Sequence, residues 1–436
     1  MEPVKIGLLG LGTVGGGTYT VLQRNAEEIA RRAGRDILVT HASIRNRARI
    51  EALGLRDVRL SEDPGSVVDD PEVEVIVEML GGDEPALTLI LRALENGKHV
   101  VTANKALIAR HGNEIFAAAQ RQGVMVAFEA AVAGGIPIIK SIREGLAGNE
   151  IRWVAGIING TGNFILTEMR DHGREFADVL AEAQRLGYAE ADPSFDVDGI
   201  DAAHKLTILA AIAFGIPLHY DAVYTEGISG VTREDVGYAS ELGYRIKHLA
   251  IARRTESGIE LRVHPTLVPE KRLIAHVDGV MNAVQIQADA LGPTLYYGAG
   301  AGAEPTASAV VADLVDVVRT LTSDPDNRVP HLAFKPDQLV DLPILPITEI
   351  ETAYYLRLQA VDRPGVMAQV SRVMGDLDIS MEAILQKEPA PGETTVPLIM
   401  LTRRVQESRI DQAIAQFRDI DAIVGDIQRI RVESLG

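Results

Sequence analysis

The chain has 436 residues, 46% of them apolar, which is enough for two or three globular domains. Its 61 acidic residues outnumber the 43 basic ones, so the net charge of −18 argues against nucleic acid and anionic membranes as partners. The absence of cysteine excludes disulfides, thiolate metal sites and cysteine nucleophiles. Without a signal peptide at the start or an apolar run long enough to span a bilayer, we expect a cytoplasmic protein.

The first region, residues 1–134, alternates short apolar runs with helical patterns. This alternation predicts a Rossmann-type, doubly wound parallel sheet of the α/β class. Strands are expected at 4–9, 37–44, 73–80, 98–103 and 123–130. Helices are expected between them, one running from the first glycines to about Arg32 and another over 85–97.

The second region, residues 135–302, mixes long amphipathic helices with strands and predicts an α+β catalytic and dimerisation domain. A helix is expected over 176–187, with strands over 151–159 and 259–268. A helical pattern near 305–320 is expected to return to the first domain, so that about 303–323 completes it.

A polar, proline-marked stretch at 324–350 is typical of a linker, and residues 351–436 follow it as a third unit. The third unit has the element order βαββαβ, which predicts a ferredoxin-like fold. Its strands are expected at 353–361, 379–386, 395–405 and 426–434, and its helices at 366–377 and 408–420.

A glycine loop, with Gly10, Gly12 and Gly15, follows the first expected strand and opens a helix. In this context the pattern predicts a dinucleotide site, because glycines let the backbone approach a pyrophosphate at a helix N-terminus. The alternative is a tight turn without a ligand. After the second strand, where NAD sites usually carry an acid, stand Arg45 and Arg47, which favour the 2′-phosphate of NADP. The alternative for these arginines is an exposed basic loop.

The segment 189–215 places five carboxylates ahead of Lys205 and then becomes almost wholly apolar. Asp201 and Lys205 are four apart and share one helix face. Because the following residues are apolar on every face, we expect a buried helix, with Lys205 at the wall of a core rather than in bulk water. Burial and neighbouring carboxylates act on its pKa in opposite directions, which suits a proton donor and acceptor. The alternative is a solvated ion pair.

Lys105 lies just past an expected strand, at the carboxyl edge of the sheet, where doubly wound folds bind ligands. A lysine there can assist a reacting oxygen or hold a carboxylate. The alternative is a surface lysine that opens a helix.

Together these motifs resemble the monofunctional homoserine dehydrogenases over nearly the whole chain. The residues between Ala183 and Lys205 follow the family signature, and "GLGTVG", "VVTANKALI", "FEAAVAGGIPII" and "INGTGNFIL" resemble family blocks in the family's order. The tail resembles an ACT domain, with a characteristic "DRPGV" turn at 362–366. We expect the form without a fused aspartokinase.

The resemblance implies reversible NAD(P)-dependent oxidation of L-homoserine to L-aspartate 4-semialdehyde, in threonine, methionine and isoleucine biosynthesis, with NADP preferred. It implies Lys205 as proton donor and Lys105 as its partner near the reacting oxygen. The substrate residues it implies are Glu190, Asp196, Asp201, Gly160 and Thr161. The cofactor residues it implies, beside the three loop glycines, are Thr13, Val14, Arg45, Lys105, Gly187 and Gly302. Asp192 and Asp198 are expected to cap helices or pair locally.

The resemblance also implies a monovalent cation, sodium, held mainly by backbone carbonyls at Glu129, Val132, Gly134 and Ile136. Oxygen ligands suit hard cations, and the expected role is structural. The residues by themselves indicate only an ordinary glycine turn.

ACT-like units bind small amino acids where two units meet, so the resemblance implies feedback by threonine and a homodimer or homotetramer. Deleting 351–436 is then expected to leave catalysis but abolish the threonine response. The alternative is a tail that only supports oligomerisation. Two other functions stay open: another NAD(P)-dependent amino-acid or semialdehyde dehydrogenase, and a non-catalytic sensor of nucleotide and amino acid.

Overall fold

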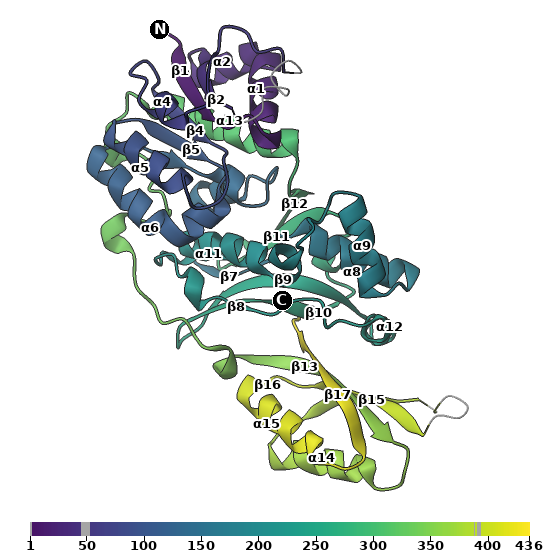
Figure 1. The fold of residues 1–436 in the computed structure, drawn as a ribbon. Coiled ribbons are helices and arrows are strands. Elements are labelled where there is room, and N and C mark those ends of the chain that lie inside the picture. The colour runs from purple at the N-terminus through teal and green to yellow at the C-terminus, as the bar shows by residue number, and fades with distance from the viewer. Residues whose placement is uncertain (1, 45–52, 388, 390–393) are drawn as a thin grey trace. The chain divides into compact units, whose positions relative to one another are not determined.

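The computed structural model describes residues 2–44, 53–387, 389 and 394–436 (Figure 1). The chain forms two compact units, each built from three separate segments. The first unit comprises Met1–Gly160, Asp201–Val223 and Val280–Leu342. The second comprises Thr161–Ile200, Tyr224–Gly279 and Pro343–Gly436.

The first unit contains a parallel sheet with the strand order β3-β2-β1-β4-β5-β6. The strands are β1 (Val4–Leu9), β2 (Ile37–Ser43), β3 (Arg59–Ser61), β4 (Val75–Glu78), β5 (His99–Thr102) and β6 (Val126–Ala127). This is the order of a Rossmann-type sheet, so the predicted α/β fold is confirmed. The order reverses between β1 and β4, and such sheets bind ligands outside the carboxyl ends of the strands at that point.

Two local predictions in this sheet were wrong. The expected long helix to Arg32 is two helices, α1 (Thr13–Arg24) and α2 (Ala26–Ala33), separated at Asn25. The run 123–130 gives only the two-residue strand β6, because the chain turns into the 3₁₀ helix η1 (Glu129–Ala131).

Helices flank the sheet, and the segment after residue 300 supplies one of them. The helices α1, α2 and α13 (Ala303–Thr320) share one core with alternate residues of β1, β2 and β4. In Figure 1 the green α13 lies beside the purple α1. A Cβ at Gly17 of α1 would lie 2.5 Å from the carbonyl oxygen of Ala303, so a glycine lets these helices pack closely. Between the strands, the described helices also include α4 (Pro64–Val68), α5 (Ala86–Glu95) and α6 (Lys105–Gln122).

The rest of the first unit adds three antiparallel strands and one buried helix. The strands β7 (Ile151–Ile157), β11 (Met281–Ala288) and β12 (Gly292–Ala299) pair in the order β12-β11-β7. The helix α11 (Ile200–Phe214) has every residue from Asp201 to Phe214 buried, as its all-round apolar sequence predicted.

The second unit contains a long antiparallel pair and several helices. The pair consists of β9 (Tyr244–Arg254) and β10 (Ile259–Pro269), with β8 (Tyr224–Thr225) beside β10. The helices are α8 (Gly160–His172), whose first residue belongs to the first unit, α9 (Phe176–Arg185), α10 (Ser194–Val197) and α12 (Arg233–Glu241).

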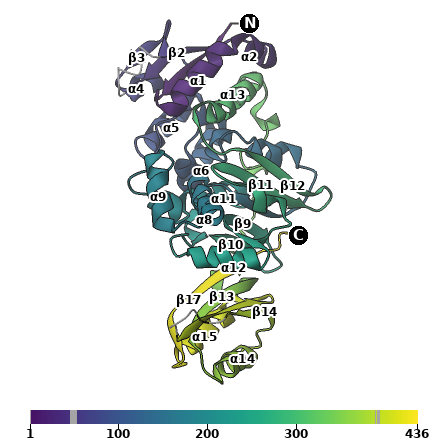
Figure 2. The same cartoon turned by 90° about the vertical axis from the view of Figure 1, so that its right-hand side faces the viewer.

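Apart from the added two-residue strand β16, the tail of the second unit has the predicted βαββαβ order, with its four main strands arranged β17-β13-β15-β14. Its elements are β13 (Glu351–Val361), α14 (Val366–Asp376), β14 (Met381–Gln386), β15 (Thr395–Thr402), β16 (Val405–Gln406), α15 (Glu407–Arg418) and β17 (Ile423–Val432). Figure 2 shows α14 and α15 together on one face of this sheet, where they share a core with it.

The opposite face of the tail sheet is also buried. Residues of β13, β15 and β17 join a core with α8, α12 and β10, and β17 pairs in parallel with β10. Among the described residues, no helix combines the length and the apolar character needed to cross a bilayer.

Candidate active site

The glycine loop between β1 and α1 has the close backbone contacts that require glycine. Gly10 has a φ of +97°, and a Cβ at Gly15 would lie 2.1 Å from the carbonyl oxygen of Gly10. At Gly12, the N-cap residue of α1, a Cβ would meet no atom of the described residues within 4 Å, its chain neighbours and the helix backbone apart. As far as the described residues show, the N-terminus of α1 is not obstructed by a side chain, which suits a pyrophosphate.

The other expected cofactor residues fall in three places. Thr13 is exposed and Val14 half-buried at the start of α1, and Gly302 is the N-cap residue of α13, directly before the Ala303 that packs on α1. Arg45 and Arg47 lie outside the described residues. Gly187, with a φ of +77°, follows α9 in the second unit.

The backbone that presents Lys105 is held by the side chains of its neighbours. Asn104 caps α6 by accepting from the amide of Leu107 at 3.2 Å, and its Nδ2 donates to the carbonyl of Gly82 at 2.6 Å. The fully buried Glu78, at the end of β4, accepts from Thr102 Oγ1 at 2.6 Å. Burial raises the pKa of the Glu78 carboxyl.

Lys105, Asp201 and Lys205 are brought together by this arrangement. Asp201 Oδ1 lies 2.6 Å from Lys105 Nζ, and Asp201 Oδ2 lies 2.7 Å from Lys205 Nζ. The first turn of α11 therefore places one carboxylate between two ammonium groups. Lys205 also donates to the carbonyl of Ile158 at 2.6 Å, and Asn159 Nδ2 donates to Asp201 Oδ2 at 3.0 Å.

Burial differs between the two lysines. The side chain of Lys205 is 9% exposed, whereas that of Lys105 is 34% exposed. The prediction that Lys205 lies in the wall of a core is confirmed. Its ammonium group points at fixed oxygen atoms rather than at open solvent.

The electrostatics of the carboxylate follow from its two partners. Burial alone would raise the pKa of Asp201, but the Lys205 and Lys105 ammonium groups outweigh it and hold that pKa well below its usual range. His204 lies on α11 between Asp201 and Lys205, and its ring stacks on that of Tyr220 with 4.4 Å between the ring centroids. Burial, with the Arg110 guanidinium, lowers the pKa of His204 to about 4, so the ring is neutral near pH 7.

The substrate residues expected in the second unit have their own local structure. Thr161 Oγ1 donates to the carbonyl of Tyr188 at 2.6 Å. Glu190 is exposed, and Asp196 is half-buried on α10. Asp192 accepts from the amide of Ser194 at 3.1 Å and from its hydroxyl at 2.6 Å, so its predicted local capping role is confirmed. Asp198 is the C-cap residue of α10.

The expected cation loop follows β6 in the first unit. The side chain of Glu129 accepts from the amides of Ile139 at 2.9 Å and Lys140 at 2.8 Å, so its carboxylate is engaged by backbone. A Cβ at Gly134 would lie 2.6 Å from the carbonyl oxygen of Gly300, so this position of the loop requires glycine. Among the described residues, no group of three or more acidic, histidine or cysteine side chains is placed so that it could hold a metal ion. A cation in this loop would need backbone carbonyl oxygens as ligands, and the carbonyl of Glu129 already accepts from the amide of Val132 at 3.3 Å.

Sequence reasoning missed four groups that hold the site: Asn159, the Ile158 carbonyl, Glu78 and Asn104. Asn159 is the second residue after the carboxyl end of β7 and precedes Gly160. That position, a polar side chain at a strand end inside "INGTGN", was the available signal. Glu78 carries a similar signal, since it is an acid at the end of an otherwise apolar strand.

Comparison with known proteins agrees with this geometry. Residues 10–129 match the family model described as homoserine dehydrogenase, NAD binding domain. Residues 137–315 match the model described as homoserine dehydrogenase, and residues 354–422 match the ACT domain.

Two of the relatives match along the full chain, and a third along most of it. The chain is 65% identical to the homoserine dehydrogenase of Pseudomonas aeruginosa, with 100% of both chains covered. It is also 65% identical to a crystal structure of a homoserine dehydrogenase from Thiobacillus denitrificans, with 100% and 99% covered and a TM-score of 0.95. A hyperthermophilic archaeal homoserine dehydrogenase solved in complex with NADPH is 28% identical, covering 74% of this chain and 100% of that one at a TM-score of 0.63.

Proposed function

The chain belongs to the homoserine dehydrogenase family, and on that premise we propose that Lys205 exchanges a proton with the hydroxyl or aldehyde oxygen of the substrate. The observation that carries this proposal is the position of the Lys205 ammonium group, buried and held between the Ile158 carbonyl and the Asp201 carboxylate. A lysine fixed in this way presents its proton in one direction without the cost of ordering a flexible side chain.

Two neighbouring groups assist that transfer. Asp201 orients Lys205 and stabilises its charged form, which is the form that donates a proton when the semialdehyde is reduced. Lys105, more exposed and bound to the other oxygen of the same carboxylate, contacts the reacting oxygen and stabilises negative charge on it. In the oxidation direction Lys205 takes the proton back from the hydroxyl. A nicotinamide cofactor, which the loop of Gly10, Gly12 and Gly15 would hold, would supply the acceptor or donor of the hydride.

The two ends of the substrate are assigned on the family resemblance. The carboxylates of Glu190 and Asp196 bind the α-ammonium group of homoserine, because opposite charges suit this contact. Gly160 and Thr161 lie at the N-terminus of α8. They bind the other polar groups at the amino-acid end of homoserine, through backbone amides and the Thr161 hydroxyl.

For the cofactor, we propose NADP in preference to NAD. The support is the pair Arg45 and Arg47 in the sequence, where an acid would serve the ribose of NAD, and the archaeal relative solved with NADPH. Sodium in the loop of Glu129, Val132, Gly134 and Ile136 would hold the turn after β6 and has no part in the chemistry.

Regulation and assembly remain proposals that rest on the ACT domain match. We propose that threonine inhibits through residues 351–436, that the chain forms a homodimer or homotetramer, and that it serves threonine, methionine and isoleucine synthesis. We also propose the functional division into 1–134 with 303–323, 135–302, the linker 324–350 and 351–436. The matches at 10–129 and 354–422 support its first and last domains, whereas the match at 137–315 runs past residue 302.

The test is homoserine-dependent reduction of NADP and of NAD, with and without threonine, by the unaltered chain and by Lys205→Met. We expect turnover to fall by about 10²–10⁴-fold in Lys205→Met, with cofactor affinity retained. Lys98→Met is the matched control. Lys98 is a lysine of the first unit that is 5% exposed and donates to backbone carbonyls, including that of Val73 at 2.9 Å.

Three results would contradict the proposal. Near-normal turnover by Lys205→Met would exclude its acid–base role. Faster turnover of another amino alcohol than of homoserine would favour a different dehydrogenase. Cofactor binding without any turnover by the unaltered chain would favour the sensor.

A further inference from the structure

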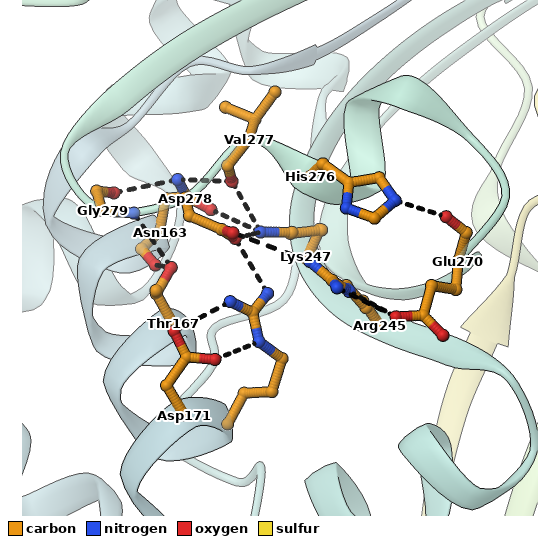
Figure 3. A network of polar contacts seen from close by, with 11 residues as sticks. Asn163, Thr167, Asp171, Arg245, Lys247, Glu270, His276, Val277, Asp278 and Gly279 are labelled. Atoms are coloured by element: carbon orange, nitrogen blue, oxygen red, sulfur yellow. Dashed lines mark hydrogen bonds and ion pairs between the residues drawn. The ribbon is translucent and has the colours of Figure 1, made fainter.

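A buried lysine in the second unit has no part in the chemistry above. Lys247 lies in β9 and is 1% exposed. Its Nζ donates to the carbonyl of Val277 at 2.6 Å, to Asp278 Oδ1 at 2.9 Å and to Asn163 Oδ1 at 3.3 Å (Figure 3). Three acceptors use the three protons of an ammonium group, so Lys247 has none to give to a substrate.

Val277 and Asp278, which accept from Lys247, belong to the loop 277–279, and residues of α8 also bind this loop. Asn163 Nδ2 donates to the carbonyls of Val277 at 3.0 Å and Gly279 at 2.9 Å. Thr167 Oγ1 accepts from the amide of Gly279 at 3.1 Å and donates to the carbonyl of Asn163 at 2.7 Å. In Figure 3 these groups converge on the loop 277–279 from α8 and from β9. Lys247 and the first two turns of α8 therefore hold one loop between them.

Asp278 completes the network. It accepts from Arg170 Nη1 at 2.8 Å as well as from Lys247, and Arg170 also binds Asp171. Burial lowers the pKa of Lys247 to about 8, with Asp278 acting against this shift and Arg170 and Arg245 adding to it. A buried ammonium group is costly, and an apolar side chain would fill the same place in β9 without that cost. We call the contacts of Lys247 and of α8 with the loop 277–279 the clamp. Fixing this loop is the benefit that can offset the cost of burying the Lys247 ammonium group.

The clamped helix leads into the substrate residues. Asn163 is two residues beyond Thr161, whose hydroxyl in turn holds the carbonyl of Tyr188. The loop 277–279 continues into Val280, whose carbonyl oxygen would lie 2.7 Å from a Cβ at Gly160. Any shift of the loop would therefore move the backbone of Gly160 and Thr161.

We propose that Lys247 is a positioning residue for homoserine. By fixing the loop 277–279 through Asp278 and Val277, it sets the position of the first turn of α8, where Gly160 and Thr161 bind the substrate. This inference rests on the proposed function, which assigns those two residues.

The test compares steady-state kinetics of two variants that break the clamp with two that do not. Lys247→Met and Asp278→Asn remove one charge each from the network. Arg262→Met is matched to the first, because Arg262 is a fully buried cation of the neighbouring strand β10 that binds Glu260 at 2.9 Å and has no bond to α8 among the described contacts. Glu270→Gln is matched to the second, because Glu270 binds Arg245 at 2.9 Å at the edge of the network in Figure 3, and no described contact joins it to Lys247 or to the loop 277–279.

We expect KM for homoserine to rise at least about tenfold in both clamp variants, with kcat reduced less than about threefold and the Kd of NADPH unchanged. The two control variants keep the KM of the unaltered chain, whatever their thermal stability. Asp278 is partly exposed, so Asp278→Asn decides the matter if Lys247→Met fails to fold.

Unchanged KM in Asp278→Asn, or an equal rise of KM in the controls, would overturn the proposal. Failure of the proposed function is a separate result, since it would appear as absent homoserine turnover in the unaltered chain.

Discussion

Asp201 carries its charge in the protein interior, where burial of a carboxylate costs free energy, and its neighbours offset this cost. Its side chain is 4% exposed, and both oxygens are bound by ammonium groups, with Asn159 adding a further hydrogen bond. A buried charge is tolerated when it is paired and its hydrogen bonds are satisfied. The spacing of Asp201 and Lys205 was readable in the sequence. The meeting of Asp201 with Lys105, 96 positions earlier, was not, because no local pattern reports a contact between distant segments.

At this scale we predict the effect of Asp201→Asn. The substitution keeps the shape of the side chain but leaves two ammonium groups without an anion between them. We expect turnover to fall about 10²-fold or more, because Lys205 loses the group that orients it. The free energy of unfolding should fall by about 3–5 kcal/mol, because the substitution removes one partner of a buried ion pair.

The measurements are kcat with homoserine and denaturant unfolding. Asp69→Asn is the control, since Asp69 pairs with Arg92 where both side chains are 42% or more exposed. Surface pairs contribute at most about 1 kcal/mol, so this variant should resemble the unaltered chain. If Asp201→Asn retained normal turnover, Asp201 would have no role in orienting Lys205.

Among the elements, the glycine loop and α11 illustrate how far a local pattern reaches. The run of apolar residues after Lys205 predicted a helix buried on all sides, and every residue from Asp201 to Phe214 is buried. The three glycines predicted a strand–turn–helix with close backbone contacts, and Gly15 against Gly10 is such a contact. Both predictions succeeded because their determinants are short-range: side-chain periodicity and the space around one turn.

For the glycine loop we predict the effect of Gly15→Ala. The new Cβ would lie 2.1 Å from the carbonyl oxygen of Gly10, so the turn between β1 and α1 must shift. We expect a loss of NADPH affinity of at least about tenfold and a loss of stability of about 1–3 kcal/mol from overpacking. Calorimetric titration with NADPH and thermal unfolding measure these quantities.

Gly237→Ala is the control, because Gly237 lies within α12 and a Cβ there would meet no atom within 4 Å in the part of the chain that the structure describes, the helix's own backbone apart. In a helix interior this change should stabilise by about 1 kcal/mol and leave NADPH binding unaltered. Tight NADPH binding by Gly15→Ala would show that the turn does not need the close contact.

At the scale of the whole molecule, the tail is built into the second unit rather than appended to it. One face of its sheet packs on α14 and α15, and the other is buried through Tyr355, Ile399 and Ile430 against residues such as Leu267. Deleting 351–436 would uncover this apolar face. From the sequence we expected this deletion to leave catalysis intact, but it would also remove part of the core of the second unit. A response to threonine is therefore better tested on the full chain.

A buried ion cluster provides a pH-dependent test of this integration. Glu433, just after β17, binds Arg253 Nη2 at 2.8 Å and also binds Arg262, which is fully buried. Burial alone would raise the pKa of Glu433, but Arg262 and Arg253 lower it to about 2. Because the folded-state pKa is depressed, the stabilisation is complete above the ordinary carboxyl pKa of 4.5 and is lost as the pH falls from there toward 2.

We therefore predict that Glu433→Gln lowers the free energy of unfolding by about 3–5 kcal/mol at pH 7, since it leaves a buried cation short of one partner. The difference from the unaltered chain should shrink as the pH drops below about 4.5. Urea unfolding at pH 7, 5, 4 and 3 measures it. Asp378→Asn, in an exposed pair with Arg409, should show little difference at any pH. A deficit for Glu433→Gln that stays constant down to pH 3 would contradict the assignment.

The sequence by itself determined the class of the first sheet, the glycine turn, the buried character of α11 and the βαββαβ order of the tail. These depend on periodicity, on turn-forming residues and on spacings of a few positions, all of which are local. Only the tertiary structure decided that Lys105 reaches the carboxylate beside Lys205, that Glu78 and Asn104 hold the loop in front of it, and that both faces of the tail sheet are covered. Those contacts join segments tens to hundreds of residues apart. They are set by how complete elements pack, because the pairing of two buried charges is stable only where the whole fold removes water from both.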